Sequence, residues 1–188
     1  MNTQSHALMG ALFFGRGISK RAWVGLLGGI TPDIPMIVIV LTLFAIGIPG
    51  HTIFDEMYWQ RWWQITNAIG HSFLLWGAVL AVSLFKRWTY PTIFSASALL
   101  HTSIDFLCHR EDAHMSFWPL SDYKFMSPVS YYDRAHYGGP FSVFEAVLGL
   151  LMAGLLSVQF KNWLVRGALT LCAVAYLAVP LMFIFSMH

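Results

Sequence analysis

The composition of the 188-residue chain indicates a membrane protein. Hydrophobic residues make up 57% of the sequence and charged residues only 11%, whereas a soluble domain carries about 25% charged residues. The formal net charge of +2 comes without a basic cluster on a polar face, so we expect no nucleic-acid partner. Cys108 and Cys172 lie in or beside apolar runs, which argues against a disulfide framework and a zinc knuckle.

Apolar segments follow one another along the chain. The first, residues 7–15, is short, and the start of the chain lacks the basic flank and cleavage site of a removable signal peptide. Five further segments reach or approach the length that crosses a hydrocarbon core of about 30 Å; they are residues 22–48, 67–85, 90–108, 141–160 and 163–185. We therefore expect residues 1–188 to form one all-α integral membrane domain, a polytopic helical bundle with about five to six transmembrane helices.

The loops between these segments differ in charge, which predicts their orientation. One set contains only basic charges, namely Arg16, Lys20, Arg21, Lys86, Arg87, Lys161 and Arg166. The other set, residues 49–66 and 109–140, mixes basic with acidic residues. The positive-inside rule places the first set in the cytoplasm and the second outside. Residues 109–140, which are rich in aromatic residues and proline, then form an extracytoplasmic loop that caps the helix ends.

The short first segment decides the number of passes. A cytoplasmic N-terminus would leave His6 in water, far from the other histidines. If residues 3–15 span instead, a rise of ~1.5 Å per residue puts His6, Asp33 and His101 about 15 to 20 Å above the inner charges. His71 and Asp105 then lie a little higher. Because separate segments bring ionisable residues to one level, we expect six passes with both termini outside.

Ionisable side chains inside a bilayer are unfavourable unless they are paired, hydrated or bound to metal. His101 and Asp105 lie four residues apart in "LLHTSIDFLCH", so one helix face can offer both to one ion. Asp33 lies in "GGITPDIP", which interrupts a helix and is tolerated only where protein or a cavity covers the backbone. The candidate metal ligands are His6, Asp33, His71, His101, Asp105, His109 and His114, with Asp33 and Asp105 also as candidate catalytic residues.

These imidazole and carboxylate ligands suit zinc, manganese or iron, and zinc is the default divalent metal for a hydrolytic site. Other interpretations stay open. A single histidine in a membrane helix is more often an interhelical hydrogen-bond partner than a ligand, and His109 and His114 can be ordinary loop residues. The cluster can then belong to a non-catalytic accessory or assembly subunit of a larger membrane complex, or be the ion site of a transporter. We expect Glu145 at the membrane interface, with a supporting role beside the ligands as the alternative.

The order of these motifs resembles a known family. His6 near the start, Pro32-Asp33 after paired glycines, "GHS" with His71, and "HTSID" are similar to motifs of the small predicted metal-dependent hydrolases of bacterial inner membranes. Those proteins resemble a membrane-embedded zinc-dependent phospholipase C. The resemblance covers roughly residues 1–120. It implies an inner-membrane hydrolase that acts on a phosphoester or other ester, with membrane lipid as a candidate substrate and these residues as ligands.

Two details qualify this resemblance. The segment "NAIGHS" lacks the basic residue common before the "THS"-type motif of the family, which leaves Arg110 or Arg134 as replacements for phosphate binding. Residues 109–133 also resemble small membrane proteins that carry a cobalamin-biosynthesis label, although the sequence has no nucleotide loop, amidotransferase cysteine motif or corrin site.

Overall fold

The computed structural model describes residues 1–185 and contains helices and loops, with no strand among these residues. The long helices are α1 (Thr3–Gly15), α2 (Ser19–Ile30), α3 (Ile34–Ala45), α4 (Arg61–Gly70), α5 (Phe73–Phe85), α6 (Thr89–Cys108), α7 (Gly138–Gln159) and α8 (Trp163–Phe185). Shorter turns are the 3-10 helices η1 (Thr31–Asp33) and η3 (Arg134–His136) and the π-helix η2 (Thr52–Met57). The prediction of an all-α fold is confirmed.

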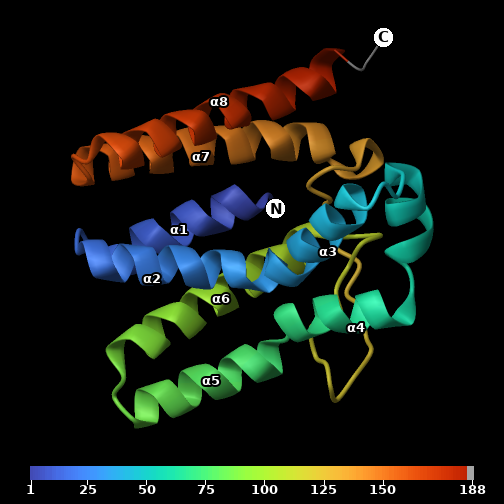
Figure 1. The fold of residues 1–188 in the computed structure, drawn as a ribbon, viewed down its shortest axis with the longest axis horizontal. Helices are drawn as coiled ribbons and strands as arrows, with labels where there is room; N and C mark the ends of the chain where they lie inside the picture. The colour runs from blue at the N-terminus through green and yellow to red at the C-terminus, as the bar shows by residue number, and fades with distance from the viewer. Residues whose placement is uncertain (186–188) are drawn as a thin grey trace.

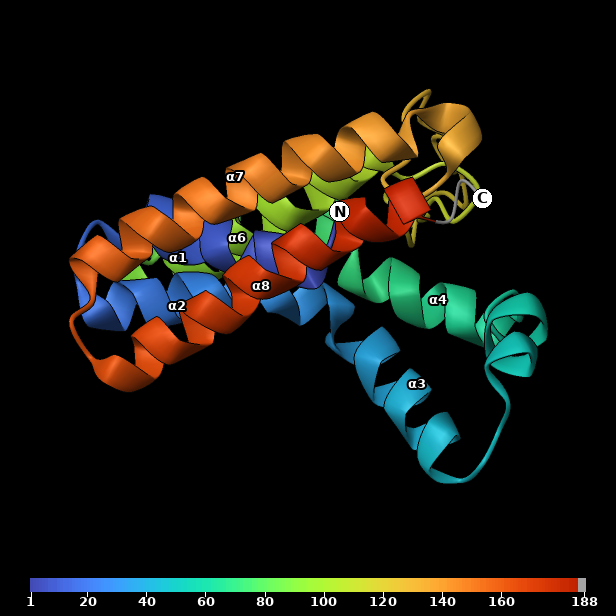
Figure 2. The ribbon, with the colours of Figure 1, turned by 90° about the horizontal axis from the view of Figure 1, so that it is seen from above.

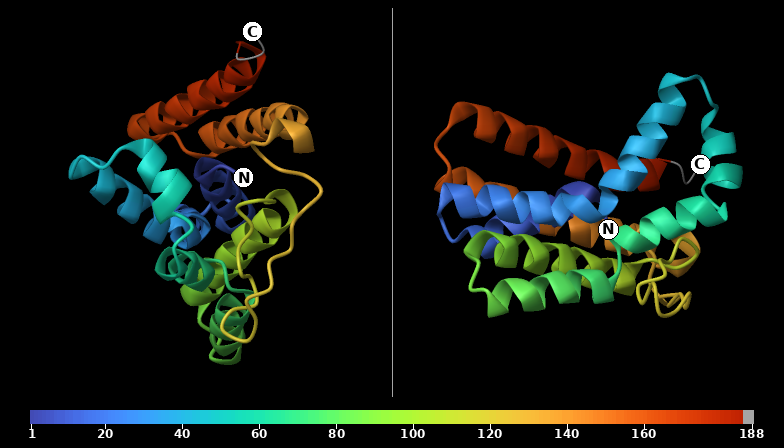
Figure 3. Two further views of the ribbon diagram at one scale, coloured as in Figure 1. Left: turned by 90° about the vertical axis from the view of Figure 1, so that its right-hand side faces the viewer. Right: turned by 60° about the horizontal axis from the view of Figure 1, so that its bottom comes forward.

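Successive helices form antiparallel hairpins, as Figure 1 shows for α1 with α2, α5 with α6, and α7 with α8. The turns within these three hairpins lie at one end of the bundle. η2 and the long loop after α6 lie at the other end, and the start of the chain lies between the two ends (Figures 1 and 3). The loop residues predicted to be cytoplasmic therefore gather at one end of the molecule.

Three helical stretches are long and apolar enough to cross a membrane: Ser19–Ala45, Arg61–Phe85 and Gly138–Gln159. Large apolar side chains are exposed along them, for example Leu41 on α3 and Leu151 on α7. These features are compatible with a membrane location. The expected count of five to six passes stays a prediction, since α1 has only 13 residues and α6 buries a polar face.

Two of these stretches are broken helices. In Ser19–Ala45 the chain passes through η1, where Pro32 has no backbone N–H to continue the helix, and α3 leaves the line of α2 (Figure 2). In Arg61–Phe85 the break lies at His71 and Ser72, and the Ser72 hydroxyl accepts a hydrogen bond of 3.2 Å from the backbone of Leu75 at the start of α5. The sequence predicted the first break, whereas residues 67–85 were expected to be continuous.

Glycines bring α1 and α2 into backbone contact. A Cβ atom on Gly10 would lie 2.1 Å from the carbonyl oxygen of Gly25, and one on Gly29 would lie 2.3 Å from that of His6. Helix pairs in membranes are stabilised by such close packing, because lipid gives no hydrophobic drive for their association. Gly29 also accepts a hydrogen bond from His101. This one glycine therefore fixes the positions of two histidines.

We predict that Gly29→Ala destabilises the protein, because the added methyl group meets backbone rather than a movable side chain. Overpacking of this kind costs about 1–3 kcal/mol. The matched control is Gly77→Ala in α5, where an added Cβ meets nothing within 4 Å. Because alanine has a higher helix propensity than glycine, we expect this variant to be as stable as the wild type or more stable. Thermal unfolding in detergent measures both changes. Equal stability of the two variants would contradict the close approach of α1 to α2.

Candidate metal centre

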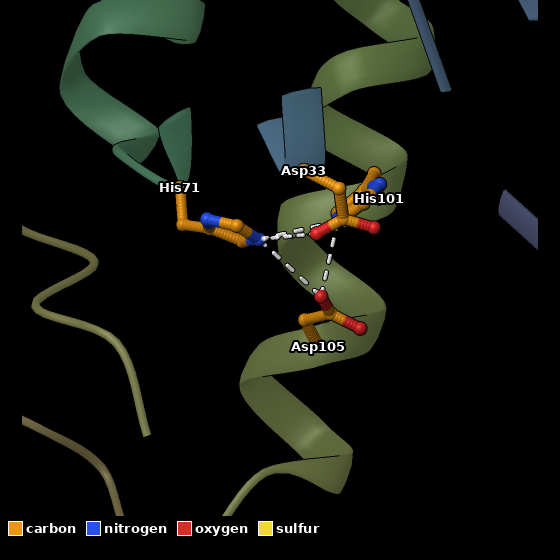
Figure 4. A group of neighbouring side chains, drawn as sticks. All are labelled: Asp33, His71, His101 and Asp105. Carbon is orange, nitrogen blue, oxygen red and sulfur yellow. Dashed lines mark hydrogen bonds and ion pairs between the residues drawn. The ribbon is translucent and has the colours of Figure 1, made fainter. Parts of the chain in front are cut away.

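Four buried side chains from three parts of the fold meet in one group (Figure 4). Asp33 comes from η1, His71 directly follows α4, and His101 and Asp105 lie one turn apart on α6. Their ligand atoms all lie within 4.8 Å of one another, so the group could hold a metal ion. The two helix breaks described above therefore deliver one histidine and one carboxylate to a helix that already carries such a pair.

The distances within this group fit tetrahedral coordination. His101 Nε2 lies 3.2 Å from His71 Nε2, 3.0 Å from Asp105 Oδ2 and 3.5 Å from Asp33 Oδ1. His71 Nε2 lies 3.4 Å from Asp33 Oδ1 and 3.5 Å from Asp105 Oδ2. Ligand bonds of about 2.0–2.1 Å in a tetrahedron separate the ligand atoms by about 3.3–3.4 Å. The side chains are therefore spaced for a small divalent cation without rearrangement.

Backbone carbonyls fix the protonation of both histidines. His101 Nδ1 lies 2.6 Å from the Gly29 carbonyl oxygen, and His71 Nδ1 lies 3.0 Å from that of Asn67. Because a carbonyl oxygen only accepts, each Nδ1 carries the hydrogen and each neutral ring presents a lone pair at Nε2. These two lone pairs face each other beside two carboxylates, an arrangement that requires a proton or a cation between them. Metal-bound histidines are oriented by the same kind of second hydrogen bond.

The other oxygen of Asp105 serves a second group. Asp105 Oδ1 lies 2.9 Å from His6 Nε2, 2.9 Å from the amino nitrogen of Met1 and 3.4 Å from His109 Nε2. Cys108, Asp105 and His109 form a further set with ligand atoms within 4.8 Å of one another. The structure therefore brings His6 and His109 to the opposite oxygen of the shared carboxylate, outside the four-residue group.

His6 and His114 are held by ring stacking. The ring of His6 lies on that of His101 with centroids 3.7 Å apart, and the ring of His114 lies on that of His71 at 3.8 Å. His6 Nδ1 is buried and has no hydrogen-bond partner in the part of the chain that the structure describes. Burial, followed by the neighbouring imidazoles of His71 and His109, holds the pKa of His114 well below its usual value. His114 is therefore neutral at pH 7, beside the group but not a member of it.

A cavity of about 530 Å³ opens onto the two carboxylates. Asp33, Asp105, His109 and His114 form part of its wall. Its other lining residues are mostly aromatic or acidic, and include Phe54, Asp55, Tyr58, Trp59, Asp112, Tyr131 and Tyr132. No lysine or arginine is among the lining residues, so the sequence-based suggestion that Arg110 or Arg134 contacts a phosphate here finds no support.

Several residues outside the predicted ligand set also hold the group. Thr3 donates a 2.6 Å hydrogen bond to Asp33 Oδ2. Glu145 on α7 accepts hydrogen bonds from the backbone and side-chain amides of Asn2, at 2.8 and 2.9 Å, and from the hydroxyl of Ser5. We expected Glu145 at the interface, but it is 2% exposed. It ties the segment before His6 to α7, and the only sequence signal was a run of polar residues ahead of an apolar helix.

Comparisons with known proteins add no relatives to this description. No family model, no curated protein and no solved structure matches the chain. The resemblance to membrane-bound hydrolases therefore stays a prediction, and the chemistry of the site is argued from its geometry.

We predict that Asp105→Asn abolishes metal binding, because the amide keeps the shape of the side chain but removes the negative charge that offsets a cation. Elemental analysis of the purified protein measures bound metal per chain. The control is Asp122→Asn, which changes an exposed carboxylate paired with Arg61 and should leave the metal content unchanged. If the group were only an interhelical polar contact, worth ~0.6 kcal/mol on average, the Asp105→Asn variant would match the wild type in metal content and stability.

Proposed function

We propose that the protein is a metal-dependent hydrolase that cleaves a phosphoester or other ester at a membrane surface, with zinc as the metal. One observation carries this proposal: two histidine nitrogens and two carboxylates converge in one buried group, and the two carboxylates also line a cavity large enough for a small ligand. A purely structural polar cluster has no need of a cavity beside it. Catalytic zinc sites use three protein ligands and keep the fourth position open; in this proposal one of the two carboxylates that line the cavity leaves that position to water or substrate.

The side chains divide the work as follows in this proposal. A bound divalent metal supplies Lewis-acid polarisation and lowers the pKa of water. His71 and His101 hold the metal in one place, because their rings are fixed by backbone carbonyls. Asp33 and Asp105 balance its charge and, since both line the cavity, orient a water molecule and accept its proton. Thr3 keeps the Asp33 carboxylate in position.

The cavity wall favours an ester that belongs to a lipid. Its aromatic residues offer apolar contact to the glycerol and acyl part of such a molecule, and no basic side chain among the lining residues competes with the metal for a phosphate oxygen. Three helical stretches have the length and apolarity of membrane spans. In this proposal they cross the bilayer and place the metal centre within reach of lipid. The protein then lies in a bacterial inner membrane, with its basic end in the cytoplasm and its cavity outside.

The rival proposal is an accessory subunit of a larger membrane complex, in which the group is structural. The dense bonding around Asp105 favours it, since both carboxylate oxygens already have partners within the chain. The two proposals differ in whether a metal-loaded protein turns over a substrate.

We predict that the purified protein hydrolyses bis(p-nitrophenyl) phosphate or p-nitrophenyl butyrate in detergent, that EDTA abolishes this activity, and that zinc or manganese restores it. His101→Gln should lower kcat by at least about 10²-fold, because it removes a ligand of the metal that stabilises the developing charge. His51→Gln, which changes an exposed histidine, is the control and should retain full activity. A metal-loaded wild type without turnover of either ester would instead favour the accessory subunit.

The orientation is tested separately, with single cysteines introduced for labelling in whole cells. A membrane-impermeant maleimide should label Ser121→Cys from outside, and Lys161→Cys only after permeabilisation, because Ser121 lies in the loop after α6 and Lys161 in the basic turn between α7 and α8. The background is the wild type, in which Cys108 is buried and Cys172 is partly buried. Labelling of Lys161→Cys in intact cells would reverse the proposed orientation.

A further inference from the structure

A second cavity, of about 400 Å³, lies at the basic end of the bundle, far from the metal centre along the helices. It is formed where the turn between α1 and α2 faces the turn between α5 and α6 (Figure 1). Three arginines line it, namely Arg16, Arg21 and Arg87. The rest of the wall is apolar or weakly polar and consists of Phe14, Leu84, Trp88, Thr89, Thr92 and Ile93.

These three arginines have no countercharge. The chain has no aspartate or glutamate in residues 1–32 or 57–104, which include all the lining residues. Within the described part of the chain, no side-chain hydrogen bond or ion pair joins Arg16, Arg21 or Arg87 to another residue. Arg166 at the same end behaves differently, because it donates to the carbonyl oxygens of Ser157 and Phe160. Three like charges around one cavity repel one another unless an anion lies between them.

The backbone conformation at Arg16 and Arg87 is a second indication that these arginines have a role other than stabilising the fold. Arg16 has a φ of 47° and Arg87 a φ of 56°, in the left-handed region where glycine is the usual residue at the end of a helix. Any side chain with a Cβ is strained there. Two turns that meet at one cavity both carry arginine at the position where glycine would be more stable.

We propose that this cavity binds the phosphodiester headgroup of an anionic phospholipid. Guanidinium groups bind phosphate oxygens in pairs and in a fixed plane, which suits arginine rather than lysine. Phe14, Leu84 and Ile93 continue the cavity along the apolar sides of the helices, where the acyl chains of a lipid extend. Trp88 lies at the level of the headgroups, as tryptophan does at membrane interfaces. A free phosphate ion would use the arginines but not this apolar wall.

The site is tested by native mass spectrometry of the full-length protein in a neutral detergent, titrated with phosphatidylglycerol or phosphatidylcholine. We expect saturable binding of phosphatidylglycerol at least about tenfold tighter than that of phosphatidylcholine, because only the former brings a net negative charge to the arginines. Equal affinity for the two lipids overturns the proposal. Displacement of phosphatidylglycerol by inorganic phosphate also overturns it, because the occupant would then be a soluble anion.

The decisive variant is Arg16→Gly/Arg87→Gly, which removes two guanidinium groups and at the same time relieves the backbone at both turns. We expect its thermal stability to equal or exceed that of the wild type, while its affinity for phosphatidylglycerol falls. The matched control, Lys20→Gln/Lys86→Gln, removes two charges from the same turns outside the cavity. The arginine pair should lose at least about tenfold more affinity than the lysine pair. Equal losses of affinity in the two double variants would mean that only the general surface charge matters, and would overturn the proposal.

A structural role for the two arginines predicts the opposite result. If they served only to offset the helix dipoles at the ends of α1 and α5, the glycine variant would be less stable and would bind phosphatidylglycerol as the wild type does. That outcome overturns the proposal as well. The readouts do not depend on hydrolysis, so they stand whether or not the metal centre is catalytic.

Discussion

The structure depends on one electrostatic constraint, the convergence of two imidazole lone pairs and two carboxylates in the buried interior of the helix bundle. His71 and His101 cannot turn away, because each ring is held at Nδ1 by a backbone carbonyl. The group is unfavourable without a positive charge at its centre. Helix breaks and glycine contacts around the group hold its four side chains in position. Two helices break at the level of the group, and glycines remove the side chains that would keep the helices apart.

Broken helices usually weaken a membrane protein, since lipid offers no partner for free backbone groups. Here both breaks are covered by other parts of the chain. At η1 the Pro32 carbonyl lies so close to Gly70 that a Cβ there would be only 2.3 Å away. The two breaks therefore pack against each other, and each shields the polar backbone of its neighbour. The residues that they expose inward, Asp33 and His71, are the ones that complete the group.

Much of this could be read from the sequence, because it depends on local rules. The composition and apolar segments predicted helices throughout, the four-residue spacing placed His101 and Asp105 on one face, and "GGITPDIP" predicted the first break. The second break was missed because "GHS" contains no proline, and its local signals, Gly70 and the capping residue Ser72, are weaker. Spacing along helices gives the depth of a residue but not its direction around the axis. The spacing therefore could not show that His6 contacts Asp105 Oδ1 while His101 contacts Asp105 Oδ2. It also could not show that Glu145 faces inward.

The position of Glu145 has a consequence for how the chain is assembled. Every residue of the four-membered group has been synthesised by the end of α6, so the ligands can collect before α7 has left the ribosome. The segment that carries His6 is made first, yet its anchor on α7 is made some 140 residues later, since Asn2 and Ser5 bond to Glu145. Until then the start of the chain has no partner on α7. Synthesis of the last hairpin thus supplies the partner that fixes the first segment of the chain, and His6 with it, beside the ligands.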